Sequence, residues 1–269
     1  MKVLKFGGSS VADAGRLQVA ARIVRGQLDG SAADGAVVVS ALGGVTDRLL
    51  GLASAGLEGR DRAEAEREAE ALRVHHLDIT AEVAADDERP AVAARVEALC
   101  DDLASALSDC EASGAGEGRS DNALIDRVVC HGELLSTRLL AAALRAEGIP
   151  AAACDARPMV LTDRSFQGAT VDLEPTLRAI ASHFAALGRD APLQVITGFL
   201  GSSPEGETTT LGRSGSDLTA ALVGAALEAE RIEIWTDVPG VMTQTYTHKH
   251  THTCAHTTHT DTDTCTHTF

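Results

Sequence analysis

The chain has 269 residues, of which 44% are hydrophobic, and a formal net charge of −16. This length is enough for one large domain or two small ones with a substantial core. The acidic balance, with no basic stripe anywhere, argues against nucleic-acid binding. No apolar run approaches the roughly 18 residues of a membrane span, and no signal-peptide segment follows Met1, so we expect a cytoplasmic protein with no membrane partner.

The cysteines that precede the last part of the chain are too widely spaced for a compact metal site. They are Cys100, Cys110, Cys130 and Cys154. We therefore expect reduced thiols at these positions, and no metal ion held by protein side chains alone.

Short apolar runs alternate with helical patterns along most of the chain. The runs that predict strands lie at 3–6, 36–40, 127–130, 149–153, 193–197 and 232–235. The patterns that predict helices lie at 9–28, 45–57, 132–147, 173–187 and 216–229. The run at 36–40 is almost all valine, which is typical of a parallel strand covered on both faces. This alternation predicts a three-layer α/β/α fold with a mainly parallel, open sheet.

An alanine-rich and heavily charged segment at about 60–117 interrupts this alternation. Its apolar residues have helical spacing, which predicts a helical pair or bundle inserted into the sheet domain. We expect this insert to end in a glycine-rich loop at 113–116. Further along, the segment 202–206 has the serine, proline and glycine residues of a hairpin tip.

The segment 244–269 consists almost entirely of threonine and histidine and lacks hydrophobic periodicity. We expect it to be a disordered tail, which leaves a domain at 1–243. One interpretation of the tail is a zinc or nickel tract formed by His248, His250, His252, His256 and His259. The other is a gene truncation, frameshift or assembly error, because a repeated CA dinucleotide encodes alternating threonine and histidine in any frame.

Two glycine-rich segments lie two hundred residues apart. The first, at 5–10, reads KFGGSS and follows the first strand; the second, at 208–217, reads TTTLGRSGSD and opens a helix. Glycine lets backbone N–H groups approach an anion closely, and a helix N-terminus carries partial positive charge. The segments also bring a lysine, an arginine and a carboxylate. Two anion cradles with these charges indicate phosphoryl transfer between two anionic substrates.

Five motifs in this order resemble the aspartate kinases of the amino-acid-kinase family. They are KFGGSS, VVVSALGGVTDRL, HGELLSTRL, TTTLGRSGSD and EIWTDVPGV, and the resemblance runs from Met1 to about Thr243. It implies that ATP, with Mg²⁺, phosphorylates the side-chain carboxylate of L-aspartate to give 4-phospho-L-aspartate. This reaction is the first step toward lysine, threonine, methionine and diaminopimelate. The resemblance also makes a homo-oligomer an option for the full-length form.

The resemblance assigns the phosphoryl side of the site to the first segment. Lys5 is implied to neutralise the transferring phosphoryl oxygens, while Gly7, Gly8 and Ser9 form the nucleotide cradle. The segment is not a P-loop, because GxxxxGK[ST] is absent. Without the other motifs, Lys5 would be read as a solvated lysine at a strand end.

The aspartate side of the site is implied to comprise Ser40, Thr46, Glu133, Arg213, Ser214, Gly215 and Ser216. Arg213 suits a carboxylate because its planar fork binds both oxygens. Glu133 matches the family's ligand for the substrate ammonium, and the hydroxyls of Ser40 and Thr46 match substrate contacts. Ordinary structural roles are the alternatives: Glu133 as a helix-dipole partner and Thr46 as a helix cap.

Asp217 is implied to orient the catalytic lysine and to help organise the metal site, and Thr236 and Asp237 match the family's nucleotide-binding pair. The chain departs from the family from Met242 onward and lacks the later FGAK segment and the regulatory domains. We therefore expect this chain to be a poor or inactive catalyst, with an exposed sheet edge that lowers stability or promotes association.

Two other functions remain open on the residues alone. One is a different amino-acid kinase, acting on glutamate, acetylglutamate, carbamate or UMP. The other is an inactive remnant that binds aspartate weakly. The motif around Glu133 and the segment TTTLGRSGSD favour aspartate over the other substrates.

Overall fold

The computed structural model describes residues 1–28, 35–59, 62–113, 121–188, 190–236 and 265–268. Within this part of the chain, one sheet has the strand order β3-β4-β2-β1-β7-β8. Its strands are β1 (Lys2–Phe6), β2 (Gly35–Val39), β3 (Ala151–Cys154), β4 (Leu193–Thr197), β7 (Arg231–Thr236) and β8 (Cys265–Thr268). Neighbouring strands pair in parallel except β8, which is antiparallel to β7. A separate hairpin joins β5 (Leu200–Ser202) and β6 (Thr208–Thr210).

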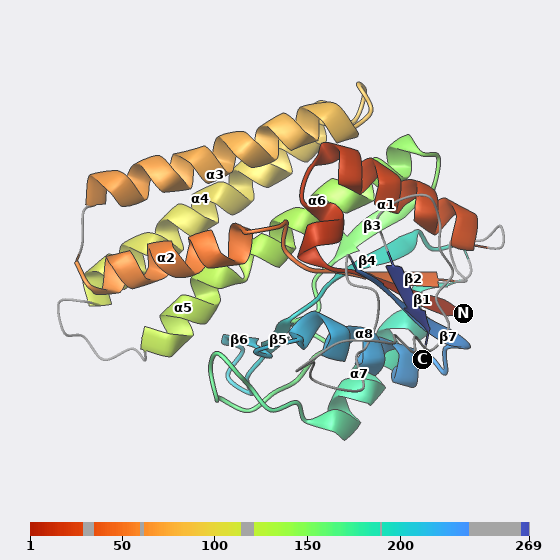
Figure 1. The fold of residues 1–269 in the computed structure, drawn as a ribbon. Coiled ribbons are helices and arrows are strands. Elements are labelled where there is room, and N and C mark those ends of the chain that lie inside the picture. The colour runs from red at the N-terminus through yellow and green to blue at the C-terminus, as the bar shows by residue number, and fades with distance from the viewer. Residues whose placement is uncertain (29–34, 60–61, 114–120, 189, 237–264, 269) are drawn as a thin grey trace, which may run out of the picture.

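Helices cover both faces of the sheet (Figure 1). The helices are η1 (Gly8–Val11), α1 (Ala14–Gln27), α2 (Val45–Leu57), α3 (Arg62–Val83), α4 (Arg89–Ser113), α5 (Asp121–Val129), α6 (His131–Ala146), α7 (Leu173–Leu187) and α8 (Gly215–Ala226). Because side chains alternate along a strand, Leu4 and Phe6 pack with α1 and α6, whereas Val3 packs with α7 and α8. The predicted three-layer α/β/α fold is confirmed.

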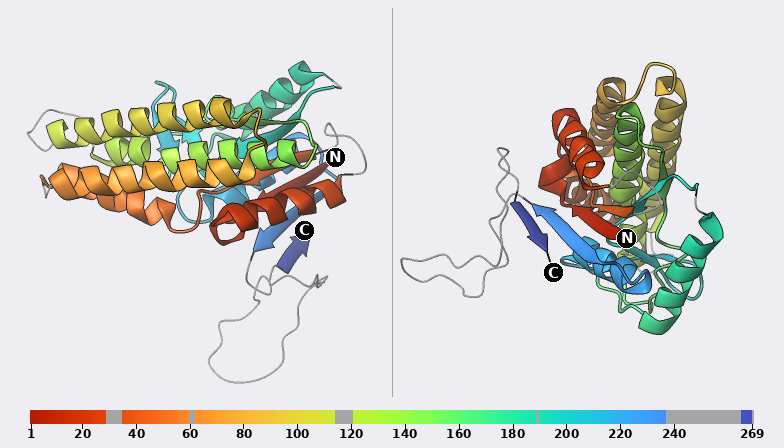
Figure 2. Two further views of the ribbon diagram at one scale, coloured as in Figure 1. Left: turned by 90° about the horizontal axis from the view of Figure 1, so that it is seen from above. Right: turned by 90° about the vertical axis from the view of Figure 1, so that its right-hand side faces the viewer.

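The segment between β2 and β3 forms a helical block beside the sheet (Figure 1, Figure 2). Its longest helices, α3 and α4, lie side by side, and both contact α2 and α6. Leu72 and Ile79 of α3 and Val96 and Leu103 of α4 are buried between them. The helical pair that the sequence predicts is therefore present, while the domain boundaries at 60–117 and 243 stay a prediction. In the described residues, no helix is long and apolar enough to cross a membrane.

The strand predicted at 127–130 is wrong. Residues of this run lie at the end of α5, and α6 begins directly after it at His131. Leu124 and Val128, four residues apart, are buried on one side of α5 in the main core. A run with only three apolar residues cannot separate a strand from a buried helix segment by periodicity, which explains the error.

Four residues of the tail, Cys265–Thr268, form strand β8, in contrast to the expected disorder of this stretch. They pair with the outer edge of β7, whose backbone N–H and C=O groups have no other strand beside them in the described structure. An unpaired edge is a template for any extended backbone, whatever its side chains. The histidines of the proposed metal tract lie outside the described residues.

Candidate active site

Lys5 and Asp217 bring the two glycine-rich segments together. Lys5 is near the carboxyl end of β1 and Asp217 is in the first turn of α8, and Lys5 Nζ lies 2.6 Å from Asp217 Oδ1. The lysine side chain is 10% exposed and the aspartate side chain 38%. The pair therefore lies at the sheet's carboxyl edge, with the lysine nearly buried and the aspartate partly open to solvent.

The loop after β1 is held by the end of β7. The N–H of Gly7 and the hydroxyl of Ser10 both donate to the carbonyl of Trp235, at 3.3 and 3.2 Å. A side chain at Gly8 would place its Cβ 3.0 Å from the carbonyl oxygen of Ala41, so this close approach favours glycine. Ser9 lies in η1, and Thr236 is the last residue of β7. Asp237 lies outside the described residues.

The start of α8 is tied to the loop after β2. The hydroxyl of Ser40 donates to that of Ser216 at 2.9 Å. A Cβ at Gly198, the residue after β4, would collide with the Ser216 side chain, so this glycine lets α8 approach the sheet. Ser214 caps α8 in a left-handed conformation with φ of 60°, which is uncommon for a residue other than glycine. Such strain is often stored at functional sites.

Arg213 projects from the same turn as an exposed side chain. None of the described residues makes an ion pair or hydrogen bond with its guanidinium group. Gly215, the first residue of α8, is buried, and a side chain there would press on Phe199. The fork of Arg213 is thus available to an anion at the mouth of the site.

Glu133 is a buried carboxyl in the first turn of α6, only 3% exposed. Its Oε1 accepts from the N–H of Ala41 at 3.0 Å, and its Oε2 is buried without a hydrogen-bond partner among the described residues. Burial raises the pKa of Glu133 to about 8, and the hydrogen bond from Ala41 opposes this only in part. Gly132 lets α6 come close to Ala41, because a Cβ atom added at this glycine would lie 2.7 Å from the Cβ of Ala41.

Thr46 lies in the first turn of α2, after Gly44, which has a φ of 79°. It is half-buried and belongs to the same loop-to-helix connection that carries Ser40 and Ala41. The structure therefore gathers the predicted residues that it describes along one edge of the sheet. At this edge lie a lysine of β1, an arginine just before α8, a buried carboxyl of α6 and several hydroxyl groups.

The sequence matches the model of the amino acid kinase family over residues 1–251. The chain belongs to this family. Among curated relatives, the lysine-sensitive aspartokinase 3 of Escherichia coli (strain K12) is 37% identical over 245 residues, which cover 90% of this chain and 50% of the relative. Aspartokinase 1, chloroplastic, of Arabidopsis thaliana is 33% identical over 90% of this chain and 41% of its own length.

Solved structures agree with this family membership. E. coli aspartokinase III in complex with aspartate and ADP superposes with a TM-score of 0.75 at 34% identity, covering 89% of this chain and 50% of that one. The chain spans about half the length of the curated aspartokinase 3 that it matches.

Asp126 is a site-supporting residue that the sequence did not single out. It is buried at the end of α5, and its carboxylate accepts from the N–H of Gln167 at 2.9 Å and from the N–H and hydroxyl of Thr210, each at 2.8 Å. Burial raises the pKa of Asp126, although these three donors oppose the shift. It holds the end of β6 three residues before Arg213. A carboxylate inside a short apolar run was the one available signal.

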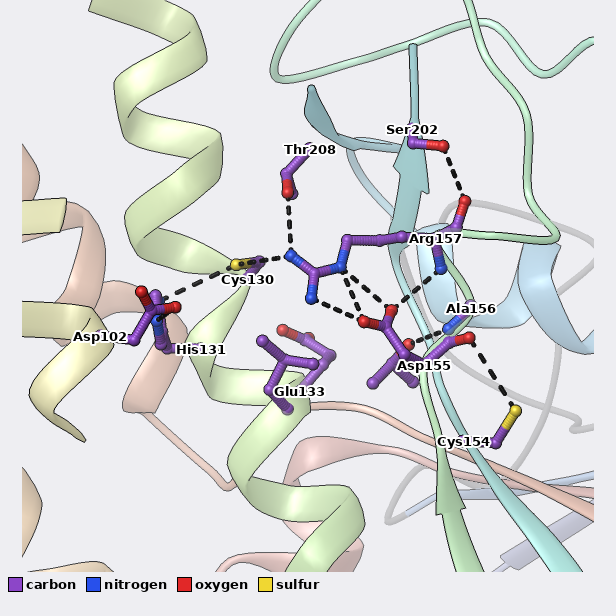
Figure 3. A network of polar contacts seen from close by, with 12 residues as sticks. Asp102, Cys130, His131, Glu133, Cys154, Asp155, Ala156, Arg157, Ser202 and Thr208 are labelled. Carbon is purple, nitrogen blue, oxygen red and sulfur yellow. Dashed lines mark hydrogen bonds and ion pairs between the residues drawn. The ribbon is translucent and has the colours of Figure 1, made fainter. Parts of the chain in front are cut away.

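A second network that sequence analysis missed lies at the carboxyl end of β3 (Figure 3). Arg157 grips Asp155 through two nitrogens at 2.6 to 3.0 Å, and its third nitrogen donates to the Thr208 hydroxyl at 3.0 Å. Figure 3 shows Glu133 on α6 beside this network. Arg157 thus links the end of β3 to Thr208, the first residue of β6. Asp126 holds Thr210, the last residue of the same strand.

Replacing Asp126 with alanine is expected to lower the free energy of unfolding by about 3 kcal/mol, because the buried N–H and hydroxyl of Thr210, and the partly buried N–H of Gln167, lose a charged acceptor. Urea denaturation measures this change. The matched control is Asp163→Ala: Asp163 also accepts hydrogen bonds from two backbone N–H groups but is exposed. The Asp163→Ala variant should lose markedly less free energy of unfolding, since water can replace the exposed carboxylate as acceptor. Equal losses in the two variants would contradict the role of burial.

Proposed function

We propose that this chain carries the phosphoryl-transfer site of an aspartate kinase, which converts ATP and L-aspartate into ADP and 4-phospho-L-aspartate. The observation that carries the proposal is the meeting, at one sheet edge, of the Lys5–Asp217 pair with the unpartnered carboxyl of Glu133. The identity to curated aspartokinases supports this specificity within the family. The reaction opens the synthesis of lysine, threonine, methionine and diaminopimelate, and a cytoplasmic location is part of the proposal.

On the aspartate side, Arg213 binds the α-carboxylate and Glu133 receives the ammonium group. Arg213 supports this role because its fork is exposed and unpaired in the described structure. Glu133 supports it because a cation beside its orphaned Oε2 would allow the buried carboxyl to ionise. Ser40, Ser214, Ser216 and Thr46 supply hydroxyl groups around the amino acid. With both ends held, the side-chain carboxylate is left as the nucleophile.

On the phosphoryl side, Lys5 neutralises charge on the transferring group, and the N–H groups at Gly7, Gly8 and Ser9 form the cradle. Asp217, 2.6 Å from Lys5 Nζ, holds the ammonium in place. Thr236 and Asp237 are proposed nucleotide contacts.

The residues at this edge fit Mg²⁺ that arrives with ATP. The described residues contain no group of three His, Cys, Asp or Glu side chains that could cage a metal ion. Magnesium instead usually binds through nucleotide phosphates and one or two carboxylates, and Asp217 is a half-exposed carboxylate at this edge. When bound, Mg²⁺ would neutralise phosphate charge.

Arg213→Lys tests the assignment of the two sides. We expect the dissociation constant of aspartate to rise by at least tenfold and that of ATP to stay within twofold, because an ammonium cannot reproduce a two-pronged grip. Calorimetric titration of each substrate measures this. The control is Arg164→Lys, at another exposed arginine, which pairs with Glu207. Weaker ATP binding with unchanged aspartate binding would reverse the assignment, and tighter binding of glutamate than of aspartate would replace the proposed substrate.

A further inference from the structure

A hollow of about 480 Å³ lies between α4, α6 and the edge strand β3, away from the site described above. In the described structure, β3 pairs only with β4, so its other edge faces this hollow. The charged residues that line it are Arg95, Arg138, Arg145 and Glu88. Three arginines against one carboxylate leave a positive surplus, in a protein whose formal net charge is −16.

The surplus belongs to Arg95 and Arg138. Arg145 is neutralised, because its Nε lies 2.6 Å from Glu88 Oε2, and its Nη1 donates to the carbonyl of Ala151 at 2.9 Å. By contrast, neither Arg95 nor Arg138 makes an ion pair or hydrogen bond with any described residue. One terminal nitrogen of Arg138, Nη1, is buried without an acceptor. A guanidinium group does not lose its proton in proteins, so this charge persists.

The surroundings of Arg138 disfavour its positive charge. Burial and the nearby Arg95 lower the pKa of Arg138, and the attraction of Asp155 opposes them only in part. Asp155 is already gripped by Arg157. An uncompensated charge that is partly buried destabilises a protein unless an anion joins it.

The backbone of β3 adds to the donor set. The carbonyl of Ala151 faces the hollow, since it accepts from Arg145. Backbone groups alternate along a strand, so the N–H of Ala153 points to the same edge. Two guanidinium forks beside a strand-edge N–H suit an oxyanion with two negative charges. The volume lies in the range typical of small-molecule sites and exceeds what a lone phosphate needs.

We infer that this hollow binds a small phosphate-bearing metabolite, whose phosphate group is held by Arg95 and Arg138. The site is independent of the proposed kinase reaction, because it uses α6 from Arg138 onward and the edge of β3 rather than the carboxyl edge of the sheet. A carboxylate from a second copy of the chain would pair with the same arginines. Phosphate titration and sedimentation velocity distinguish these two occupants.

The probe is inorganic phosphate, titrated calorimetrically into the whole 269-residue chain at constant ionic strength maintained with chloride. We expect Arg138→Gln and Arg95→Gln each to weaken phosphate binding at least tenfold. Arg95 is exposed, so that variant keeps the fold even if Arg138→Gln does not. The matched control is Arg178→Gln, at an exposed arginine on α7, which should change the affinity less than twofold.

Arg213→Gln separates this site from the active site, where phosphate can also bind. The affinity of the hollow for phosphate should be unchanged in Arg213→Gln, even if the proposed kinase function is wrong. Unchanged binding in the Arg95→Gln and Arg138→Gln double variant would overturn the inference, as would an equal loss in Arg178→Gln. Sedimentation velocity completes the test: phosphate should leave the sedimentation coefficient unchanged, whereas dissociation of a dimer by phosphate would show that a second copy fills the hollow.

Discussion

Replacing Lys5 with alanine is expected to lower kcat for aspartate-dependent ADP release about 100- to 1000-fold, the loss typical of one transition-state donor. Lys5 is nearly buried at the carboxyl end of β1 and paired with Asp217. In its absence, water therefore cannot take over the stabilisation of charge on the phosphoryl group. The assay uses the longest form of the protein that contains this chain. Aspartate binding, measured by calorimetry, should remain largely intact, because Arg213 and Glu133 are the proposed contacts.

The matched control for this prediction is Lys2→Ala. Lys2 belongs to the same strand but lies at its amino end, where its Nζ donates to the carbonyl of Gln27. The Lys2→Ala substitution removes the same charge from β1 and should leave kcat within about twofold of the parent. A near-normal kcat in Lys5→Ala would rule out the role of Lys5, and an equal loss in both variants would assign the effect to the net charge of the strand.

The second large effect concerns Glu133→Gln, which should stabilise the protein and abolish aspartate binding. The folded protein holds the carboxyl proton up to about pH 8, whereas the unfolded chain releases it near pH 4.5. The folded state therefore binds more protons in this window, so stability falls as the pH rises through it. By pH 7 the cost is about 3 kcal/mol. Glutamine keeps the acceptor for the Ala41 N–H and carries no charge, so this cost disappears.

Urea denaturation from pH 4 to pH 8 measures the difference between Glu133→Gln and the parent. It should be near zero at pH 4 and should grow with pH. Glu174→Gln, at an exposed glutamate paired with Arg178, is the control and should lack this trend. A pH-independent difference for Glu133→Gln would show that the carboxyl is ionised in the folded protein. Unchanged aspartate binding would remove Glu133 from the proposed ammonium site without affecting the stability argument.

Local patterns determined most of the secondary structure. The helices predicted at 45–57 and 173–187 and the strand at 193–197 have the same bounds in the structure. Each is long enough, or sufficiently bounded by glycine and proline, for its hydrophobic period to be unambiguous. The alternation of these elements then implied the layered parallel sheet, because parallel strands need crossover helices on both faces.

The motifs determined which residues lie at the sheet's carboxyl edge, but not their partners. Lys5 and Glu133 follow from position in the chain, since residues at the ends of parallel strands and the starts of helices meet at one edge. That Lys5 contacts Asp217, and that Glu133 keeps one oxygen without a partner, depended on how the loops pack.

Tertiary structure alone decided three further features. The run at 127–130 became helical because its apolar residues face a core built by distant helices. Asp126 acquired its role from Thr210, which lies 84 residues away in the sequence. The positive hollow depends on arginines of α4 and α6 that line one cavity beside the edge strand β3. Sequence periodicity reports which face of one element is buried, whereas burial of a charge, and the pKa it takes, depends on neighbours that are remote in the chain.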